Sequence, residues 1–266
     1  MLKRIIKKVG MSIAPHVMIE FLSARSQRLI QKIERDSGCG KASQDFVAAH
    51  GREVLRGPFK DMRYPERIAR ERNLVHRLVG SYERELHPWI EEIILGNYAM
   101  LVDIGTADGF YAVGFAMRMP STKVIGFDTD RWARGATREL VQENGCVNVE
   151  VKSICTPAWI RDNVLPNSLI FSDCEGYEMA LFDPEVAPIL TACDVVIELH
   201  ERVEPGVEDA IRARFSATHD IRLSTYFDHD PAEFAELEVL PLDMRRAVIS
   251  EGRGGPQNVL FLTRKG

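Results

Sequence analysis

The sequence of 266 residues predicts an α/β fold, namely a doubly wound, Rossmann-like, mostly parallel sheet of seven strands with a C-terminal antiparallel hairpin. Three observations predict it. Short apolar runs alternate with segments of helical periodicity from residue 99 onward. A glycine-punctuated turn, residues 105–109, joins the first run to the first helical segment. Ionisable residues stand at the carboxyl ends of four of the five runs that we expect to be parallel strands.

The first strand, turn, helix and second strand form a unit that predicts a nucleoside-containing cofactor. We expect a strand at 99–102 closing on Asp103, a helix at 110–119, and a strand at 123–127 ending on Asp128. Gly105 and Gly109 permit a sharp turn and a close approach to a ligand, toward which the helix start presents free N–H groups. A carboxylate about 20 residues beyond such glycines binds ribose hydroxyls in nucleotide-binding βαβ units, which is the role we predict for Asp128. The alternative is a turn without a ligand.

The residues of this turn indicate which nucleoside-containing cofactor it would bind. A dinucleotide fingerprint has a glycine at its second position to admit the pyrophosphate, where this sequence has Ala107. Asp108 adds a negative charge where diphosphate oxygens would lie. Asp103 is suited to a cationic amino group and to a sulfonium, so the pattern favours S-adenosylmethionine.

The remaining elements follow the same alternation. We expect a helix at 131–144 ended by Gly145, strands at 148–152, 168–172 and 194–199, a short helix to 182, a helix at 207–217, and a terminal hairpin of 221–227 and 259–263. Upstream, we expect helices at 42–56 and 66–97 around a turn at 57–59. The predicted organisation is a helical N-terminal extension or cap (1–90) and a cofactor domain (91–266) with an insertion at about 228–256.

Composition narrows the functional classes. The net charge of −5 gives no global electrostatic support for nucleic-acid binding. Five scattered cysteines without a Cys-x-x-Cys pair predict reduced thiols and argue against a disulfide framework or a zinc site. No apolar run approaches the roughly 18 residues that span a bilayer, so we expect a soluble, cytoplasmic protein. The basic, amphipathic residues 1–36 suggest weak contact with a membrane surface or, as we favour, docking on the domain or a second subunit.

The strand ends supply the candidate chemistry, because ligands of open α/β sheets bind outside the carboxyl ends of the strands. Besides Asp103 and Asp128, the residues expected there are Asp173, Glu175, Glu198 and His200. Methyl transfer to a hydroxyl depends mostly on orientation, worth up to roughly 7–11 kcal/mol, and a general base accelerates it by about 10²- to 10⁴-fold. Asp173, Glu175 and His200 are the candidate catalytic residues, and His200 is favoured because its ordinary pKa is near neutrality. Glu175 and Glu178 could instead stabilise the first turn of the short helix.

Three segments resemble the FkbM-type family of class I S-adenosylmethionine-dependent methyltransferases. They are the turn at 103–109, the pattern Asp-Cys-Glu-Gly-Tyr-Glu at 173–178 followed by Leu181, and the run 196–200. The resemblance covers about residues 80–201 and the strand 259–263.

The resemblance implies a role for several positions. Asp103, Gly105, Ala107 and Gly109 would line the methionine end of the cofactor, Asp128 would bind the ribose, Thr129 and Ile154 or Cys155 would lie near the adenine, and Asp173 and Glu175 would face the transfer site. Tyr82 and Glu83, just upstream of the first strand, could close over the cofactor or the acceptor. The family implies O-methylation of sugars, polyketides and other small molecules. The fourth strand also lacks the Asn-Pro-Pro-Tyr-type loop that binds nucleobase amines.

Three alternatives remain open at the level of sequence. A divalent metal could assist the transfer through Asp173, Glu198 and His200, although the favoured interpretation assigns no residue to a metal. A NAD(P)-dependent oxidoreductase is disfavoured by Ala107 and Asp108 and by the lack of a Tyr-x-x-x-Lys pair at Tyr177. A non-catalytic nucleoside-binding module is the third. The identity of the acceptor and the oligomeric state cannot be predicted, and specificity would come from residues 40–90 and 228–257.

Overall fold

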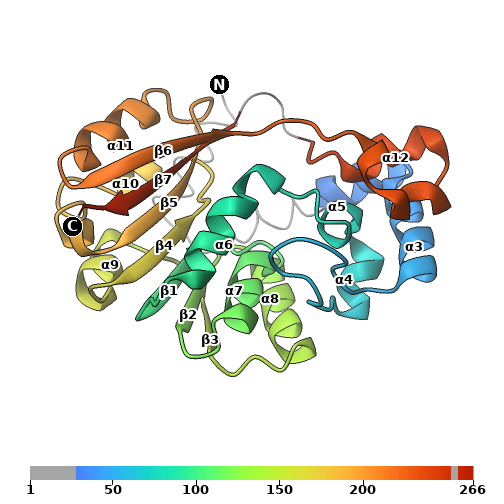
Figure 1. The fold of residues 1–266 in the computed structure, drawn as a ribbon, viewed down its shortest axis with the longest axis horizontal. Coiled ribbons are helices and arrows are strands. Elements are labelled where there is room, and N and C mark those ends of the chain that lie inside the picture. The colour runs from blue at the N-terminus through green and yellow to red at the C-terminus, as the bar shows by residue number, and fades with distance from the viewer. Residues whose placement is uncertain (1–27, 253–256, 266) are drawn as a thin grey trace.

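The computed structural model describes residues 28–252 and 257–265, which form a seven-stranded sheet flanked by helices (Figure 1). The strand order is β3-β2-β1-β4-β5-β7-β6. The strands are β1 (Met100–Ile104), β2 (Lys123–Phe127), β3 (Val149–Lys152), β4 (Ser168–Ser172), β5 (Asp194–Leu199), β6 (His219–Thr225) and β7 (Asn258–Arg264). The first five run parallel, and β7 runs antiparallel to both β5 and β6. The predicted fold class is therefore confirmed.

Both faces of the sheet are covered, because alternate residues of a strand point to opposite sides. Leu101 of β1 packs into one core and Val102 into the other. On the first face lie α6 (His87–Leu95), α7 (Phe110–Arg118) and α8 (Arg131–Glu143); on the second lie α9 (Pro157–Asn163), α10 (Glu178–Leu181), η2 (Ile189–Ala192) and α11 (Val207–Phe215). The central strands are thus buried on both sides.

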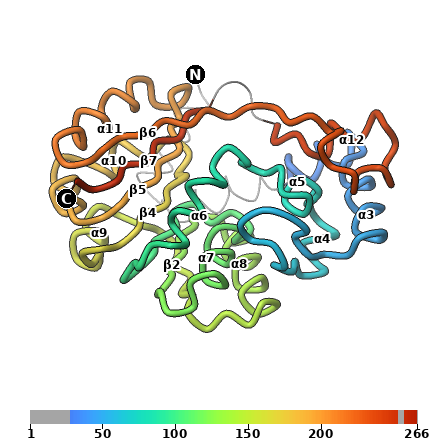
Figure 2. The backbone as a smooth tube through the Cα atoms, viewed as in Figure 1, coloured from blue at the N-terminus to red at the C-terminus, as the bar shows by residue number. Residues whose placement is uncertain are grey.

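A group of short helices, here called the helical cap, extends from the first face (Figures 1 and 2). It comprises α3 (Cys39–His50), α4 (Glu66–Glu71), α5 (Val75–Leu78), η3 (Pro231–Glu233), η4 (Ala235–Val239) and α12 (Leu242–Ile249). Helix α12 contacts α3 and α5, so the insertion packs against helices from the start of the chain. Phe46, Leu237 and Ile249 are buried in one core with Leu101 of the sheet. The predicted boundary near residue 90 stays a prediction.

The segment 66–97 differs from the expected helix, since it is divided into α4, α5, η1 (Arg84–Leu86) and α6. Gly80 has a φ of 73°, and a Cβ there would lie 2.7 Å from the carbonyl oxygen of Arg56. Glu83 also takes a left-handed conformation, with a φ of 43°. The chain therefore turns between α5 and α6 and brings residues 77–86 over the sheet.

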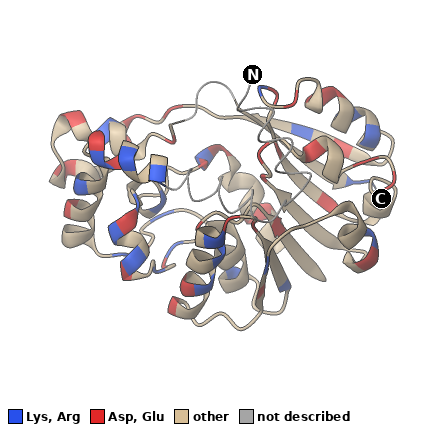
Figure 3. Cartoon of the chain, turned by 180° about the vertical axis from the view of Figure 1, so that it is seen from behind, with Lys and Arg blue, Asp and Glu red and all other residues tan. Residues whose placement is uncertain are grey.

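Figure 3 shows charged residues on the helices, the loops and parts of the strands, and β4 has none. Within the two described ranges, no helix has both the length and the apolar character needed to cross a membrane. The predicted membrane contact involves residues 1–36, of which 1–27 lie outside the described residues.

Candidate active site

A cavity lies at the carboxyl ends of the strands, between the sheet and the helical cap. It encloses about 450 Å³ of empty space, including solvent at its mouth. Its walls come from the strands (Asp103, Phe171, Ser172, Val196, Glu198, Val259), the loops after β1 and β4 (Gly105, Thr106, Ala107, Asp108, Asp173), α7 (Phe110, Tyr111) and the segment before α6 (Arg77, Tyr82, Glu83, Leu86). Asp103 pairs with Phe171, and Phe171 with Val196, in the register of the sheet. One row of side chains across three strands therefore forms the floor.

Asp103 is the buried acid of this cavity. The residue is 2% exposed, and its Oδ2 atom is buried without a hydrogen-bond partner among the described residues. Burial, reinforced by the negative charge of Asp128, raises the pKa of this carboxyl to about 8. A buried carboxylate of this kind is costly unless a cation or a donor satisfies it. The cavity therefore presents an unsatisfied acceptor atom to a ligand.

The turn at 105–109 is shaped by contacts with the neighbouring loop and helix. Gly105 has a φ of 93°, and a Cβ there would lie 1.7 Å from the carbonyl oxygen of Asp173. Gly109 has a φ of 96° and lies against Thr137 of α8. The sequence offered close approach to a ligand as the reason for these glycines. The structure gives a further reason, which is that Gly105 lets the β4 loop touch the turn.

Asp128 holds the same turn from the end of β2. Its Oδ2 accepts the backbone N–H of Ala107 at 2.9 Å, and its Oδ1 accepts that of Asp130 at 2.7 Å. Burial raises the pKa of this carboxyl to about 6. Because each carboxylate oxygen has a second lone pair, both can still accept a ribose hydroxyl. The role in ribose binding stays a prediction.

Arg77 and Asp108 form a buried ion pair at the cap side of the cavity. The Nη1 atom of Arg77 lies 3.2 Å from Oδ2 of Asp108, and its guanidinium lies 4.4 Å from the ring centre of Tyr82. Burial opposes the charge of Arg77, but the charge of Asp108, together with those of Tyr64, Tyr82 and Glu83, outweighs burial and raises the pKa of the guanidinium. Its Nε atom is buried without a hydrogen-bond partner among the described residues. Asp108 is therefore neutralised, so it repels phosphates less than the sequence suggested.

Tyr82 and Glu83 line the cavity, and their closing over a cofactor or an acceptor stays a prediction. The ring of Tyr82 meets Phe110 edge-on at 5.4 Å. The carboxylate of Glu83 accepts the hydroxyl of Tyr111 on α7, and its backbone N–H donates to Glu251 of the insertion at 2.9 Å. The wall above the cavity thus connects α7 to the insertion.

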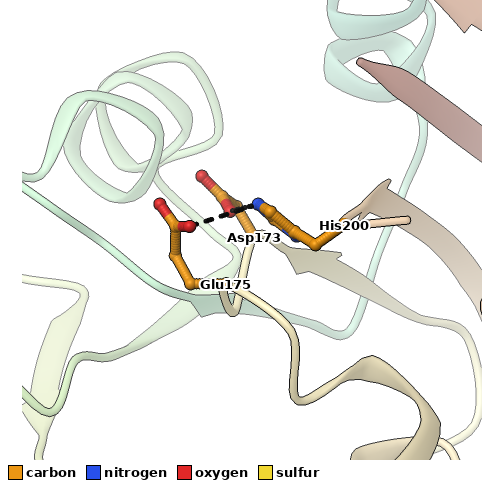
Figure 4. Close-up of side chains that lie close together, drawn as sticks. All are labelled: Asp173, Glu175 and His200. Atoms are coloured by element: carbon orange, nitrogen blue, oxygen red, sulfur yellow. Dashed lines mark ion pairs between the residues drawn. The ribbon is translucent and has the colours of Figure 1, made fainter. Parts of the chain in front are cut away.

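A second group of polar side chains lies beside the cavity (Figure 4). Nε2 of His200 lies 3.5 Å from Oδ1 of Asp173 and 3.4 Å from Oε2 of Glu175. Its Nδ1 lies 2.6 Å from Oε1 of Glu178, which is fully buried. Burial lowers the pKa of His200, but the hydrogen bond and charge of Glu178, together with the charges of Glu175 and Glu198, outweigh burial, so this pKa is raised. The same bond lowers the pKa of Glu178.

The structure divides the predicted site residues into two sets. Six lie on the cavity wall, namely Tyr82, Glu83, Asp103, Gly105, Ala107 and Asp173, and Asp173 also joins Glu175 and His200 in the second group. Five others lie outside both the wall and this second group, namely Gly109, Asp128, Thr129, Ile154 and Cys155. Ile154 is 43% exposed, whereas Cys155 is buried, which raises the pKa of its thiol to about 12. The adenine roles of Thr129, Ile154 and Cys155 stay predictions.

Two residues of the site were not assigned a role there from the sequence. Arg77 lies in a segment whose only visible signal was helical periodicity. Glu178 was interpreted as a charge in the first turn of a helix, yet it pairs with a histidine 22 residues away. Neither contact is local in the chain, so no spacing rule could find it. The pattern Asp-x-Glu-Gly-x-Glu followed by a strand ending in His was the available signal.

No protein-family model matches the chain, and no curated protein matches it. Solved structures with a similar fold include an rRNA methylase from Streptococcus thermophilus (13% identity, 69% of this chain and 98% of that one, TM-score 0.49). A precorrin-6y C5,15-methyltransferase from Geobacter metallireducens is 11% identical over 71% of this chain and 88% of that one, with a TM-score of 0.45. The bifunctional kinase-methyltransferase WbdD is 15% identical over 83% of this chain and 46% of that one, with a TM-score of 0.46.

Proposed function

We propose that the protein transfers a methyl group from S-adenosylmethionine to a hydroxyl group of a small-molecule or glycan-type acceptor. The observation that carries this proposal is Asp103, whose buried Oδ2 lacks a partner among the described residues and whose side chain lines the cavity. An ammonium or a sulfonium would satisfy that atom and remove the cost of burying the charge. S-adenosylmethionine carries both cations within a few bonds of each other.

The second support is the pairing of opposite charges within the cavity. The methionine end of the cofactor has a carboxylate as well as an ammonium. Arg77 lines the cavity, and its Nε atom is a buried donor without a hydrogen-bond partner among the described residues. Arg77 and Asp103 therefore match the two charges of an amino-acid zwitterion, which a nicotinamide dinucleotide does not have.

The third support is the overall charge of the wall. Five carboxyl groups line the cavity, from Glu83, Asp103, Asp108, Asp173 and Glu198, against the single guanidinium of Arg77. Because Asp108 is paired with Arg77, a pyrophosphate would face the other four acids and the Cβ of Ala107. This balance favours a cationic nucleoside over a dinucleotide.

Hydroxyl methylation is supported by the group around His200. In the transfer, the acceptor oxygen bonds to the methyl carbon, the carbon–sulfur bond breaks with its electron pair on sulfur, and the hydroxyl proton goes to the protein. Asp173, Glu175 and His200 are the candidate proton acceptors, and Glu178 orients the imidazole. The resemblance to FkbM-type enzymes in the segment 173–178 supports O-methylation of a small or glycan-type molecule. The helical cap would select that acceptor, and we expect neither a nucleic-acid acceptor nor a location outside the cytoplasm.

Calorimetric titration of the purified protein tests the cofactor. We expect micromolar binding of S-adenosylmethionine and S-adenosylhomocysteine and no binding of NADH or NADPH. Asp103→Asn keeps the shape of the side chain and should weaken binding by about 1.5–3 kcal/mol, whereas Asp162→Asn on the exposed surface of α9 should not. Binding of NADH alone, or equal binding by the Asp103→Asn variant, would contradict the proposal. Transfer of a labelled methyl group to a panel of sugars and small alcohols then tests the acceptor class.

A further inference from the structure

The group beside the cavity has the composition and spacing of a metal site. Asp173, Glu175 and His200 each offer a ligand atom, and these three atoms lie within 4.8 Å of one another. We propose that these residues bind one divalent transition-metal ion, such as Zn²⁺, Co²⁺ or Mn²⁺. Metal binding itself does not depend on the proposed methyl transfer. Only the role that we give the ion in the reaction rests on the proposed function.

The distances fit the coordination sphere of such an ion. Bonds of about 2.1 Å to nitrogen and oxygen place the ligand atoms of a tetrahedral site about 3.4 Å apart. Nε2 of His200 lies 3.5 Å from the Asp173 oxygen and 3.4 Å from the Glu175 oxygen. Figure 4 shows the imidazole edge directed at both carboxylates. An ion could therefore bind with little movement of the ligands.

The orientation of His200 is an independent indication, since it depends on a residue outside the set of ligands. The residue is 7% exposed, and its Nδ1 is held at 2.6 Å by the buried Glu178. When Nδ1–H donates to that carboxylate, the neutral ring directs the lone pair of Nε2 at two carboxylate oxygens. In the metal-free protein a proton on Nε2 supplies the positive charge between these atoms, and a divalent ion would take the place of that proton. Metal-binding histidines in proteins almost always have such a carboxylate, carbonyl or water on the other nitrogen.

The ligand types indicate the class of ion. One imidazole and two carboxylates suit Zn²⁺, Co²⁺ and Mn²⁺, whereas Mg²⁺ and Ca²⁺ prefer oxygen ligands alone. The predicted metal alternative included Glu198, but the structure places Glu198 on the cavity wall and Glu175 beside His200. Three protein ligands leave a position open for a small molecule.

The location gives the ion a role in the proposed reaction. Asp173 belongs both to this group and to the cavity wall. An acceptor hydroxyl bound at the open position would lie next to the cofactor cavity. The ion would lower the pKa of this hydroxyl, as it lowers the pKa of a bound water molecule. With the ion bound, Asp173, Glu175 and His200 would be its ligands and no longer proton acceptors, so the hydroxyl proton would pass to solvent as the oxygen attacks the methyl carbon and the carbon–sulfur bond breaks.

The proposal is tested by metal binding to the full-length protein. Chelator-treated protein is titrated with Co²⁺ at pH 8 and followed by calorimetry and by the visible absorption of the ion, and Zn²⁺ is then added as a competitor. We expect one ion per chain. Glu175→Gln alters a side chain that is 79% exposed, so the fold should tolerate it, and it should weaken binding at least tenfold. Glu178→Gln should weaken binding about 10- to 100-fold, the usual effect of losing the partner of a ligating histidine.

Asp209→Asn, an exposed acid on α11, is the matched control and should bind Co²⁺ as the wild type does. The proposal is overturned if the wild type binds no Co²⁺ at millimolar concentration, or if Glu175→Gln and Glu178→Gln both bind it normally. Titration with S-adenosylmethionine separates the two proposals. Binding of S-adenosylmethionine without binding of metal would overturn the metal site and leave the proposed function standing. Binding of metal without binding of S-adenosylmethionine would overturn the proposed function and leave the metal site standing.

Discussion

Binding of S-adenosylmethionine should release a proton from Asp103. The buried carboxyl has a pKa of about 8 in the free protein, so about nine molecules in ten carry the proton at pH 7. A cation at its Oδ2 favours the ionised form and lowers this pKa. If the pKa falls below about 6, about 0.8 proton leaves per cofactor bound at pH 7. At pH 9 the group is already ionised in the free protein, so the release should fall to about 0.1 proton.

The same linkage fixes the direction of the pH dependence of affinity. Removing the proton costs about 1.4 kcal/mol at pH 7 and almost nothing at pH 9, so the dissociation constant should fall about tenfold as the pH rises. Calorimetry in buffers of different ionisation enthalpy measures the release, because the observed binding enthalpy varies with buffer ionisation by the number of protons released. Titrations in phosphate and Tris at pH 7 and at pH 9 give both quantities.

Asp103→Asn removes the titrating group and keeps its shape, so its proton release should be close to zero at both pH values. Asp128, whose pKa is about 6, should contribute about 0.1 proton at pH 7 and remains in that variant. Asp162→Asn is the surface control and should release as much as the wild type. A wild type that binds the cofactor with no proton release at pH 7, or an Asp103→Asn variant that releases the same 0.8 proton, would refute the role of Asp103.

Two further perturbations test the turn that we propose binds the cofactor. Gly105→Ala places a Cβ within 1.7 Å of a backbone oxygen, at a residue whose φ is 93°. In denaturant titrations it should lower the free energy of unfolding by about 3–5 kcal/mol. The control is Gly135→Ala, in open space on α8, which should be neutral or stabilising by up to about 1 kcal/mol. Asp128→Ala should weaken S-adenosylmethionine binding by about 1.5–3 kcal/mol and lower the free energy of unfolding by about 1–2 kcal/mol, because two backbone N–H groups lose their acceptor. Unchanged affinity in the latter variant would exclude Asp128 from the cofactor site.

The sheet was predictable because its signals are local. Strands β2, β4 and β5 begin and end at the predicted residues, and helix α7 ends one residue early. Apolar runs buried on both faces and bounded by glycines or acids leave few alternative assignments. The helical cap was less predictable. Its backbone turns at Gly80 and Glu83, and the turn at Gly80 touches the carbonyl of Arg56, a residue 24 positions earlier that periodicity cannot detect.

In the candidate site, the residue types could be predicted from the sequence, whereas their contacts could not. The sequence predicted Asp103, Asp173 and His200 as site residues, because the carboxyl ends of parallel strands converge. The sequence did not predict the side chains with which the site residues interact. Asp108 is neutralised by Arg77, and Glu178 orients His200, through contacts that the fold creates between distant segments. Residue types at strand ends therefore predict a reactive region, whereas their charge states depend on tertiary partners.

Asp173 explains how the two parts of the site are held together. Its backbone N–H donates to the carbonyl of Ile104 at 2.8 Å, and its own carbonyl lies where a Cβ of residue 105 would be. The turn that would hold the cofactor and the loop that carries Asp173 and Glu175 are therefore in direct contact. A methyl donor in the cavity and an acceptor at the group around His200 would be positioned by one residue and its backbone. Since orientation supplies most of the acceleration in methyl transfer, this contact accounts for a glycine at 105 better than ligand approach alone does.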